Sequence, residues 1–500
     1  MGNLNKNIIS NFGMQLMVLA SQLFLLPFYV RILGVESYAL VGIYISLQGV
    51  FVMFDLGMST TINQEMAKTL AHKENKQNAV DLLRTFEWIY WILAILLFFI
   101  VYFIIPFFTN EWKAESSIAN EELKSNLILI SILIVLRFPI SFYTGALNGM
   151  QQQYKMNIVS IVLELFKFSL IVFVITYIHK SIQVFFLVNI AITILQLAIL
   201  KWIIYSNFKH TEFRARFRKK YIYNNWKFSL GISLVSIAAI LVSQSDKLIL
   251  GKMVSMTDFS YYALAFSIAS IPSKIYSAIA AAFYPQLVHE KTLAQGDNLK
   301  LIYHRSCQLI SILVIPVVVI AFFFMPELLN IWFGGSITSQ ILTPLVRVLI
   351  IGFTLNGFVT MPYYLQLVHR WTRLSFYKNL IAMVILLPSL YFSILNYGIY
   401  GACWIWLMLN LMYFVFEIPI MHRKIMKTEQ AKYYLEDIGK ILISSLFFTG
   451  ILFLGIGLFE VNIYVLLIIL IVAGIIQVIL LNKISSERPL GKFSNYSILN

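Results

Sequence analysis

The chain has 500 residues, of which 59% are hydrophobic and 12% charged, whereas a soluble globular domain is roughly 45–50% apolar and about 25% charged. A single water-soluble core is therefore excluded, because its surface would carry too few polar groups to stay dispersed. The chain has 23 glycines, 12 prolines and 2 cysteines, which excludes fibrous, disordered and disulfide-stapled classes. The net charge of +15 does not by itself indicate nucleic acid, because membrane proteins gather lysines and arginines on cytoplasmic loops.

Apolar runs between charged breaks predict about 14 transmembrane helices, each close to the roughly 20 residues that a span requires. The runs are too long, and alternate too little, for the strands of a membrane barrel. The first run lacks a small-residue cleavage site, so we expect it to be retained. The expected fold is an all-α polytopic membrane protein with spans at 8–33, 37–63, 86–108, 124–147, 154–178, 181–206, 226–250, 259–285, 303–325, 340–367, 374–395, 399–421, 438–458 and 461–482.

The basic residues predict the orientation of these spans. If both termini are cytoplasmic, most lysines and arginines fall in the tails and in the even-numbered connections, including the longest basic stretch at 209–221. This matches the positive-inside rule, which also explains that stretch more simply than a specific binding patch does. The connections expected outside hold only Arg31, Lys113, Lys124, Lys180, Lys247 and Lys252.

A short sequence echo suggests an internal repeat. Ile-Leu-Gly at 32–34 is followed by Ser-Tyr at 37–38, and Ile-Leu-Gly at 249–251 is followed by Ser-Tyr at 260–261. Six spans separate the two strings, as expected for parallel repeats in a transporter. We therefore expect two pseudo-symmetric six-helix lobes plus two extra C-terminal helices. The predicted parts are an N-lobe at 1–206, a basic cytoplasmic linker at 207–225, a C-lobe at 226–425, spans 13 and 14 at 426–482, and a cytoplasmic tail at 483–500.

Ionisable residues inside the predicted spans are the candidate functional groups. Each costs roughly 2.5–3.5 kcal/mol at the bilayer centre, so it should face water or a partner. Glu164 and Lys167 lie three residues apart on one helix face and can neutralise each other. The remaining cations could instead tie helices together through backbone carbonyls. The deepest positions are Asp55, Arg137, Glu164, Lys167, Lys274 and Arg347, and Arg31 and Asp246 lie near the outer rim.

The deep charges are mostly positive, and both predicted lobes contribute. The first lobe supplies Arg137 and Lys167, and the second supplies Lys274 and Arg347. A cleft between lobes lined in this way would attract an anion, above all a phosphate, with which arginine pairs bidentately.

Common catalytic and nucleotide-binding motifs are missing from the sequence. There is no Walker sequence, no GxGxxG after a strand, no HExxH and no CxxC pair. We expect no enzymatic activity, no cofactor, no metal site and no nucleic-acid partner.

Three stretches resemble a known family. They are LPFYVRILGVESYALVGIYISLQGVFVMFDLGMSTTINQEMAK at 26–68, SQSDKLILGKMVS at 243–255 and IPSKIYSAIAAAFYPQL at 271–287. The chain resembles bacterial O-antigen and capsule repeat-unit flippases, which are polysaccharide transporters of the MATE-like multidrug/oligosaccharidyl-lipid/polysaccharide superfamily. The likeness covers nearly the whole chain in length and helix count.

This resemblance implies a substrate and a mechanism. The substrate would be an undecaprenyl-pyrophosphate-linked oligosaccharide, flipped across the bacterial inner membrane by alternating access and driven by an ion gradient. Membrane lipids are expected partners, and the polysaccharide polymerase and chain-length proteins are further candidates. The predicted phosphate or acidic-sugar contacts are Arg137, Lys274 and Arg347, then Lys167 and Arg31; the predicted ion-coupling or gating residues are Asp55, Asp246 and Glu164.

Other functions are compatible with the same pattern. A multidrug cation antiporter of the same superfamily would typically place an acid in the first helix of a lobe, where span 1 holds only Arg31 but span 7 holds Asp246. A peptidoglycan-precursor (lipid II) flippase is a second alternative. A membrane enzyme such as the polymerase would favour a large outer loop, and the longest one here, 109–123, is short.

Overall fold

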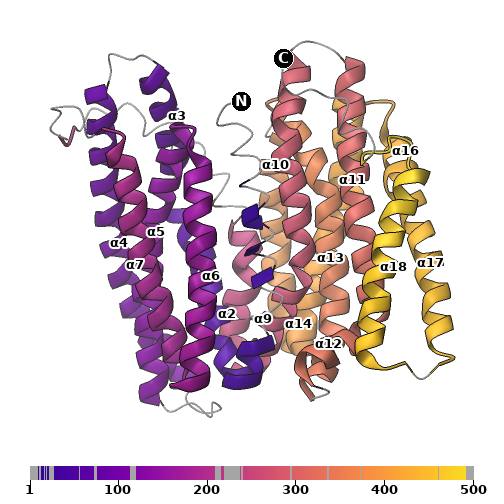
Figure 1. Ribbon diagram of the computed structural model, residues 1–500, viewed down its shortest axis with the longest axis horizontal. Coiled ribbons are helices and arrows are strands. Elements are labelled where there is room, and N and C mark those ends of the chain that lie inside the picture. Colours follow the sequence, from indigo (N-terminus) through magenta and orange to yellow (C-terminus); the bar gives the residue numbers. More distant parts are fainter. Residues whose placement is uncertain are drawn as a thin grey trace. The chain divides into compact units, whose positions relative to one another are not determined.

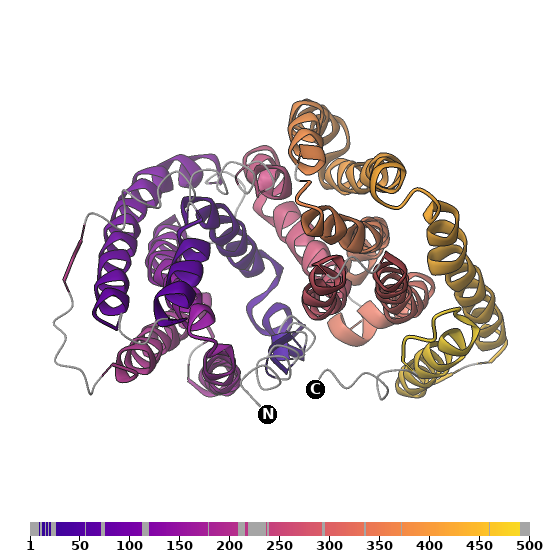
Figure 2. The same cartoon turned by 90° about the horizontal axis from the view of Figure 1, so that it is seen from above.

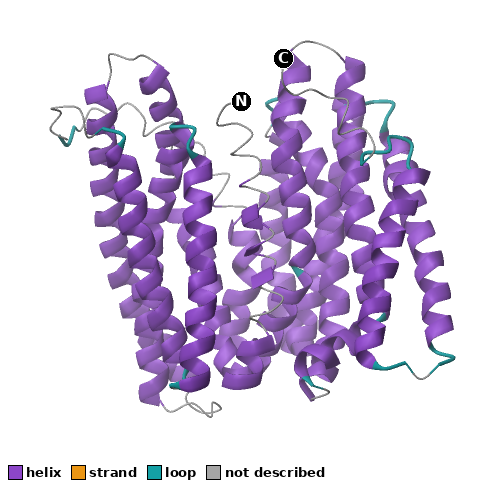
Figure 3. Ribbon diagram, viewed as in Figure 1, coloured by secondary structure: helices purple, strands orange, loops and turns teal. Residues whose placement is uncertain are grey.

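The structure is a computed structural model whose described residues are helical, with turns between them (Figure 3). No strand occurs among the described residues, which are 27–55, 57–71, 76–112, 120–178, 180–208, 216–218, 240–292, 296–334, 337–371, 373–459, 461–490 and isolated positions before 27 and at 237. Helices are expected here because a bilayer offers no water to backbone amides and carbonyls, so each span must satisfy its hydrogen bonds internally. The predicted all-α membrane class is confirmed.

The chain divides into two compact units, 1–263 and 264–500. Residues 27–33 and 240–253 of the first unit are also helical. Each is followed by a short break before the next helix, at the two places where the sequence echo lies. The helices of the first unit are α2 (Val35–Phe51), η1 (Val52–Asp55), α3 (Met58–Ala71), α4 (Lys76–Trp112), α5 (Asn120–Gly149), α6 (Gln153–Tyr177), α7 (Ile182–Ser206) and the start of α9 (Met256–Ala269) (Figure 1).

The second unit ends in a helix pair that packs beside α11. Ile320 and Phe324 at the end of α11 form an apolar cluster with Leu466 and Leu470 of α18, and Figure 2 shows α17 and α18 together at one side of this unit. Its elements are α10 (Ile271–Thr292), α11 (Gly296–Phe323), α12 (Met325–Phe333), α13 (Ile337–Val368), α14 (Arg373–Met412), η3 (Tyr413–Glu417), α15 (Ile418–Ile425), α16 (Gln430–Lys432), η4 (Tyr433–Gly439), α17 (Lys440–Ile456) and α18 (Ile463–Ile484).

The helices expose large apolar side chains that only a lipid solvent accommodates. Phe447 and Leu454 of α17 are each 71% exposed, and Ile468 of α18 is 61% exposed. Soluble proteins rarely expose such continuous apolar surface. The described helices include 11 stretches long and apolar enough to cross a membrane, so the chain is a multi-pass membrane protein.

The predicted number of 14 crossings stays a prediction. The first and seventh predicted spans lie largely outside the described residues, whose helical parts there are 27–33 and 240–253. The eleventh and twelfth predicted spans fall in one stretch, 373–425. That stretch bends at Gly398, whose φ of 55° and ψ of −137° are not helical. Gly398 stands at the turn that the sequence predicts.

Most of the predicted linker at 207–225 lies outside the described residues, so the lobe boundaries remain predictions. The described part is attached to α4. Arg218 forms an ion pair with Asp81 at 2.6 Å, and the Arg216 amide donates to the same carboxylate at 2.9 Å. Basic charge in this stretch is thus partly used to bind the first unit itself.

Two glycines allow α3 and α5 to approach closely. A Cβ atom on Gly145 would lie 2.6 Å from the Ile62 side chain and against the Ser59 backbone, and one on Gly149 would lie 2.7 Å from Met66 Cβ. Only hydrogen fits at these distances, because core packing leaves no free volume. The small residues therefore set the helix separation, as in other membrane bundles.

We predict that Gly145→Val lowers the free energy of unfolding by about 1–3 kcal/mol, because the new side chain forces α3 and α5 apart. The measurement is thermal or denaturant unfolding of the purified protein in detergent. Gly450→Val in α17 is the matched control, since nothing lies within 4 Å of a Cβ there. Equal destabilisation by both variants would show that helix propensity, not packing, limits this site.

Candidate functional site

The first unit holds a half-buried cation beside a buried tyrosine. Arg137 lies on α5, and its guanidinium carbon is 5.7 Å from the centre of the Tyr44 ring on α2. Tyr29 and Tyr44 are buried. Arg137 Nε and the hydroxyl oxygens of both tyrosines are buried without a hydrogen-bond partner among the described residues. Buried polar atoms normally have hydrogen-bond partners. These three groups could therefore donate hydrogen bonds to a bound anion or polar ligand.

An ion pair on α6 lies close to this arginine. Lys167 Nζ is 2.6 Å from Glu164 Oε2, and Lys167 is buried. The pair confirms the neutralisation expected from the three-residue spacing. Both Glu164 and Arg137 lie close enough to Lys167 for their charges to interact. Because Glu164 offsets Lys167, Arg137 remains as the uncompensated positive charge of this cluster.

The two deep cations of the second unit have different surroundings. Lys274 on α10 is half-buried, and neither a hydrogen bond nor an ion pair joins its amine to any described residue. Arg347 on α13 instead donates to the carbonyl oxygens of Phe322, at 2.8 Å, and Phe323, at 3.3 Å. These carbonyls end α11, where helical partners run out and the helix dipole attracts a cation. Arg347 therefore connects α13 to the end of α11, whereas the amine of Lys274 is available to bind a ligand.

Asp55 joins three elements of the first unit. Its carboxylate accepts hydrogen bonds from the Tyr90 hydroxyl on α4, from Ser141 Oγ on α5 at 2.9 Å and from the Ser59 amide in the first turn of α3 at 3.2 Å. A carboxylate near a helix N-terminus is favoured by the unpaired amides there. These contacts hold η1 against α3, α4 and α5 without a ligand.

Asp246 also forms contacts with other side chains of the first unit. It is 4% exposed, its carboxylate lies 3.1 Å from Lys247 Nζ, and it accepts a hydrogen bond of 2.5 Å from the Tyr262 hydroxyl. Lys247 offsets its charge. Arg31 lies on the exposed side of helix 27–33 and belongs to neither cluster.

Glu87 has partners that the sequence does not indicate. This buried carboxylate of α4 accepts hydrogen bonds from Tyr143 at 2.8 Å and Tyr205 at 2.9 Å, and pairs with Lys201 at 2.9 Å and Arg84 at 3.2 Å. The network fastens α4 to α5 and α7. Its members are up to 118 residues apart, so no local spacing could have indicated it.

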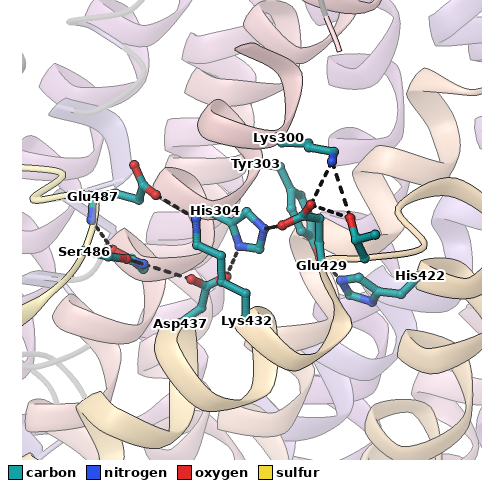
Figure 4. A network of polar contacts seen from close by, with 11 residues as sticks. Lys300, Tyr303, His304, His422, Glu429, Lys432, Asp437, Ser486 and Glu487 are labelled. Atoms are coloured by element: carbon teal, nitrogen blue, oxygen red, sulfur yellow. Dashed lines mark hydrogen bonds and ion pairs between the residues drawn. The ribbon is translucent and has the colours of Figure 1, made fainter. Parts of the chain in front are cut away.

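A second network that the sequence did not indicate surrounds His304 on α11 (Figure 4). The imidazole lies 2.5 Å from Asp437 on η4 through Nδ1 and 3.1 Å from Glu429 through Nε2. Lys300 pairs with Glu429 at 2.8 Å. Gln308 extends the network, because its amide donates to Asp437 at 2.9 Å.

This network attaches the C-terminal helix pair to α11. Gln308 also donates to Ser486 at 2.7 Å, and Lys432 pairs with Glu487 at 2.9 Å, so the segment after α18 is held as well. The hydrogen bond from Lys300 lowers the pKa of Glu429 to about 2. Glu429 is thus ionised at neutral pH, as its role between two basic groups requires.

Nothing in the described part of the chain forms a metal centre. No group of three or more histidine, cysteine or acidic side chains there is placed to hold a metal ion. The intramembrane cations can bind and position an anion.

Comparison with known proteins defines first the class and then the family. A similar fold occurs in a lipid II flippase, MurJ, in an inward closed conformation, which aligns with a TM-score of 0.72 and 16% identity, covering 95% of this chain and 97% of MurJ. An inward-facing multidrug resistance MATE family transporter of the MOP superfamily aligns with a TM-score of 0.66 and 13% identity, covering 85% and 99%.

The sequence family described as polysaccharide biosynthesis protein matches residues 4–289. The chain belongs to this family, as expected from its resemblance to polysaccharide transporters. A putative O-antigen transporter of Shigella flexneri is 20% identical over 392 residues, which cover 76% of this chain and 88% of that protein.

We predict that the His304 network loses its contribution in acid. Glu429 has a folded pKa of about 2, below its ordinary 4.5. Its ionisation therefore stabilises the fold fully above pH 4.5, and this contribution is lost as the pH falls through 2. The difference in Tm between the wild type and Glu429→Gln should be largest at pH 7 and shrink towards pH 3.

The control is Glu436→Gln, because Glu436 is an exposed acid on η4 of the same unit. This variant should change Tm little at either pH. A Glu429→Gln difference that is the same at pH 7 and pH 3 would contradict the role given to its charge.

Proposed function

We propose that the protein is a flippase that moves undecaprenyl-pyrophosphate-linked oligosaccharide repeat units, of the O-antigen or capsule type, across the bacterial cytoplasmic membrane. Membership of the polysaccharide biosynthesis family supports a role in the production of polysaccharide. The similarity to a putative O-antigen transporter supports transport rather than synthesis. The polymerase and chain-length proteins of such a pathway are proposed partners.

The observation that carries the proposal is the half-buried guanidinium of Arg137, whose buried Nε lacks a hydrogen-bond partner among the described residues. A charge inside a membrane protein is retained only where it meets a partner or serves transport. A pyrophosphate supplies what Arg137 lacks, namely several strong acceptor oxygens and negative charge. Lys274 offers the same chemistry in the second unit. Lys167, Arg31 and Arg347 are secondary candidates, since the first is paired, the second exposed and the third bonded to carbonyls.

Polar aromatic side chains suit the sugar part of such a substrate. The hydroxyl oxygens of Tyr29 and Tyr44 are buried without a partner among the described residues, and so is Trp406 Nε1. Trp406 also packs against Phe353 in a tilted arrangement, with ring centres 5.2 Å apart. Sugars combine hydroxyl groups with apolar ring faces, so donors beside aromatic surface fit them. The polyprenyl tail would stay in the surrounding lipid.

We further propose transport by alternating access, driven by an ion gradient, with both termini in the cytoplasm. Asp55, Asp246 and Glu164 are the proposed gating or coupling residues. Each carboxylate bonds to a group on another helix or to a neighbouring cation. A proton or metal cation that binds one of them would weaken those contacts, and so would shift the balance between conformations.

One observation weighs against the multidrug antiporter. Asp246, the acid best placed to bind a drug cation, is already neutralised by Lys247 at 3.1 Å. Among the intramembrane groups, the less satisfied ones are cations, which favour an anionic substrate.

We predict that Arg137→Gln combined with Lys274→Gln abolishes surface polysaccharide in the producing cell. Each substitution removes a charged hydrogen-bond donor worth about 1.5–3 kcal/mol, which is a roughly tenfold to hundredfold loss per site. The measurement is polymer on the cell surface, with the amount of protein in the membrane determined in parallel.

Lys155→Gln is the matched control, because Lys155 lies in a connection predicted to be cytoplasmic and should leave the polymer unchanged. Arg137→Lys keeps the charge but not the bidentate fork, so it should restore transport partly. Normal polymer at normal levels of the double variant would overturn the assignment of these cations.

A further inference from the structure

A cavity of about 550 Å³ lies in the second unit where α15 ends. Its lining residues are Trp371, Ile420, Arg423, Lys424 and Lys427. Three of these five carry positive charge, and none of the residues is acidic. The positive-inside pattern of the sequence predicts that this end of the unit faces the cytoplasm. The cavity therefore combines an aromatic ring, an apolar side chain and three cations at a membrane–water boundary.

The three cations lack counter-ions in the described part of the chain. No hydrogen bond or ion pair joins the side chains of Arg423, Lys424 or Lys427 to any described residue. Lys424 Nζ lies 4.0 Å from the centre of the Trp371 ring, so a cation–π contact holds it at the cavity wall. The acid next along the chain, Glu429, is engaged by Lys300 and His304. The cavity thus presents positive charge that no acid in the described part of the chain pairs with.

An exposed apolar path leads to this charge. Phe416 and Ile420 lie four residues apart and are 61% and 44% exposed. Residues at this spacing share a helix face, and Arg423 and Lys424 continue the same face by three and four residues. Tryptophan at such a boundary is typical of the interface between lipid tails and head groups. One face therefore passes from lipid-facing apolar side chains to cations over about two turns.

We propose that this cavity binds the head group of an anionic membrane phospholipid. The phosphate lies among Arg423, Lys424 and Lys427, and one acyl chain follows Phe416 and Ile420. Charge complementarity selects an anionic over a zwitterionic lipid, and each lysine or arginine near an anionic membrane surface strengthens the attraction. The apolar path favours a lipid over a free phosphate ion, because a phosphate ion has no acyl chain to pack along the path.

This site is separate from the proposed transport function. It contains none of the deep cations, and it uses a lipid that stays in its leaflet rather than one that is flipped. A bound anionic lipid would brace the junction of α13, α14 and α15 against the membrane surface.

The test is native mass spectrometry of the purified protein with palmitoyl-oleoyl phosphatidylglycerol, compared with phosphatidylcholine of the same chains. We expect more phosphatidylglycerol to be retained, and expect Arg423→Gln with Lys424→Gln to weaken its binding about tenfold or more. Trp371→Leu, which keeps every charge, should weaken it less but measurably. All of these side chains are at least partly exposed, and gel filtration checks that the variants stay folded.

Lys155→Gln with Lys483→Gln is the matched control, since it removes the same charge from the same predicted face outside the cavity and should not change binding. Equal losses in both double variants would show a non-specific charge effect and overturn the proposal. Equal retention of the two lipids would also overturn it. So would displacement by inorganic phosphate, which would indicate a free-anion site, or by undecaprenyl phosphate, which would indicate a substrate site.

Discussion

The free-energy cost of placing charge in a low-dielectric membrane determines which contacts the ionisable side chains of this structure make. Each buried ionisable group must either find a partner or serve a ligand, because an uncompensated charge destabilises the fold. Most groups here have found partners: Lys167 pairs with Glu164, and Asp246 with Lys247. Of the two deep arginines, Arg347 bonds to backbone carbonyls, whereas Arg137 Nε has no hydrogen-bond partner among the described residues. The same criterion that explains the helix contacts also selects the candidate site.

Much of this architecture could be predicted from the sequence because the signals are local. Apolar runs indicated helices, and the short sequence at Asn396–Gly398 indicated a bend that the backbone of Gly398 confirms. The spacing of Glu164 and Lys167 indicated their ion pair. These features need only the periodicity of one helix, or the conformational freedom of one glycine. The lobes, the orientation and the roles of the individual site residues remain predictions.

Long-range contacts could not be predicted, because residue type and depth do not reveal a partner. Arg137 and Arg347 looked equivalent in the sequence, yet Arg347 bonds to the carbonyl oxygens that end α11. His304 and Asp437 are 133 residues apart, and no periodicity relates them. Only the packing of α11 against η4 brings that pair together. The sequence could therefore identify the candidate charged residues. It could not show which of them bond to other parts of the protein and which could bind a ligand.

The most direct test of the central claim is a transport measurement with two substrates in proteoliposomes. One carries its oligosaccharide on undecaprenyl pyrophosphate, and the other carries the same oligosaccharide on an uncharged polyprenyl linker. We predict that the wild type moves the pyrophosphate-linked substrate at least tenfold faster, and that Arg137→Gln removes this preference while moving the uncharged one at its original rate. A preference that persists unchanged in Arg137→Gln would contradict the claim that this arginine recognises the transported anion.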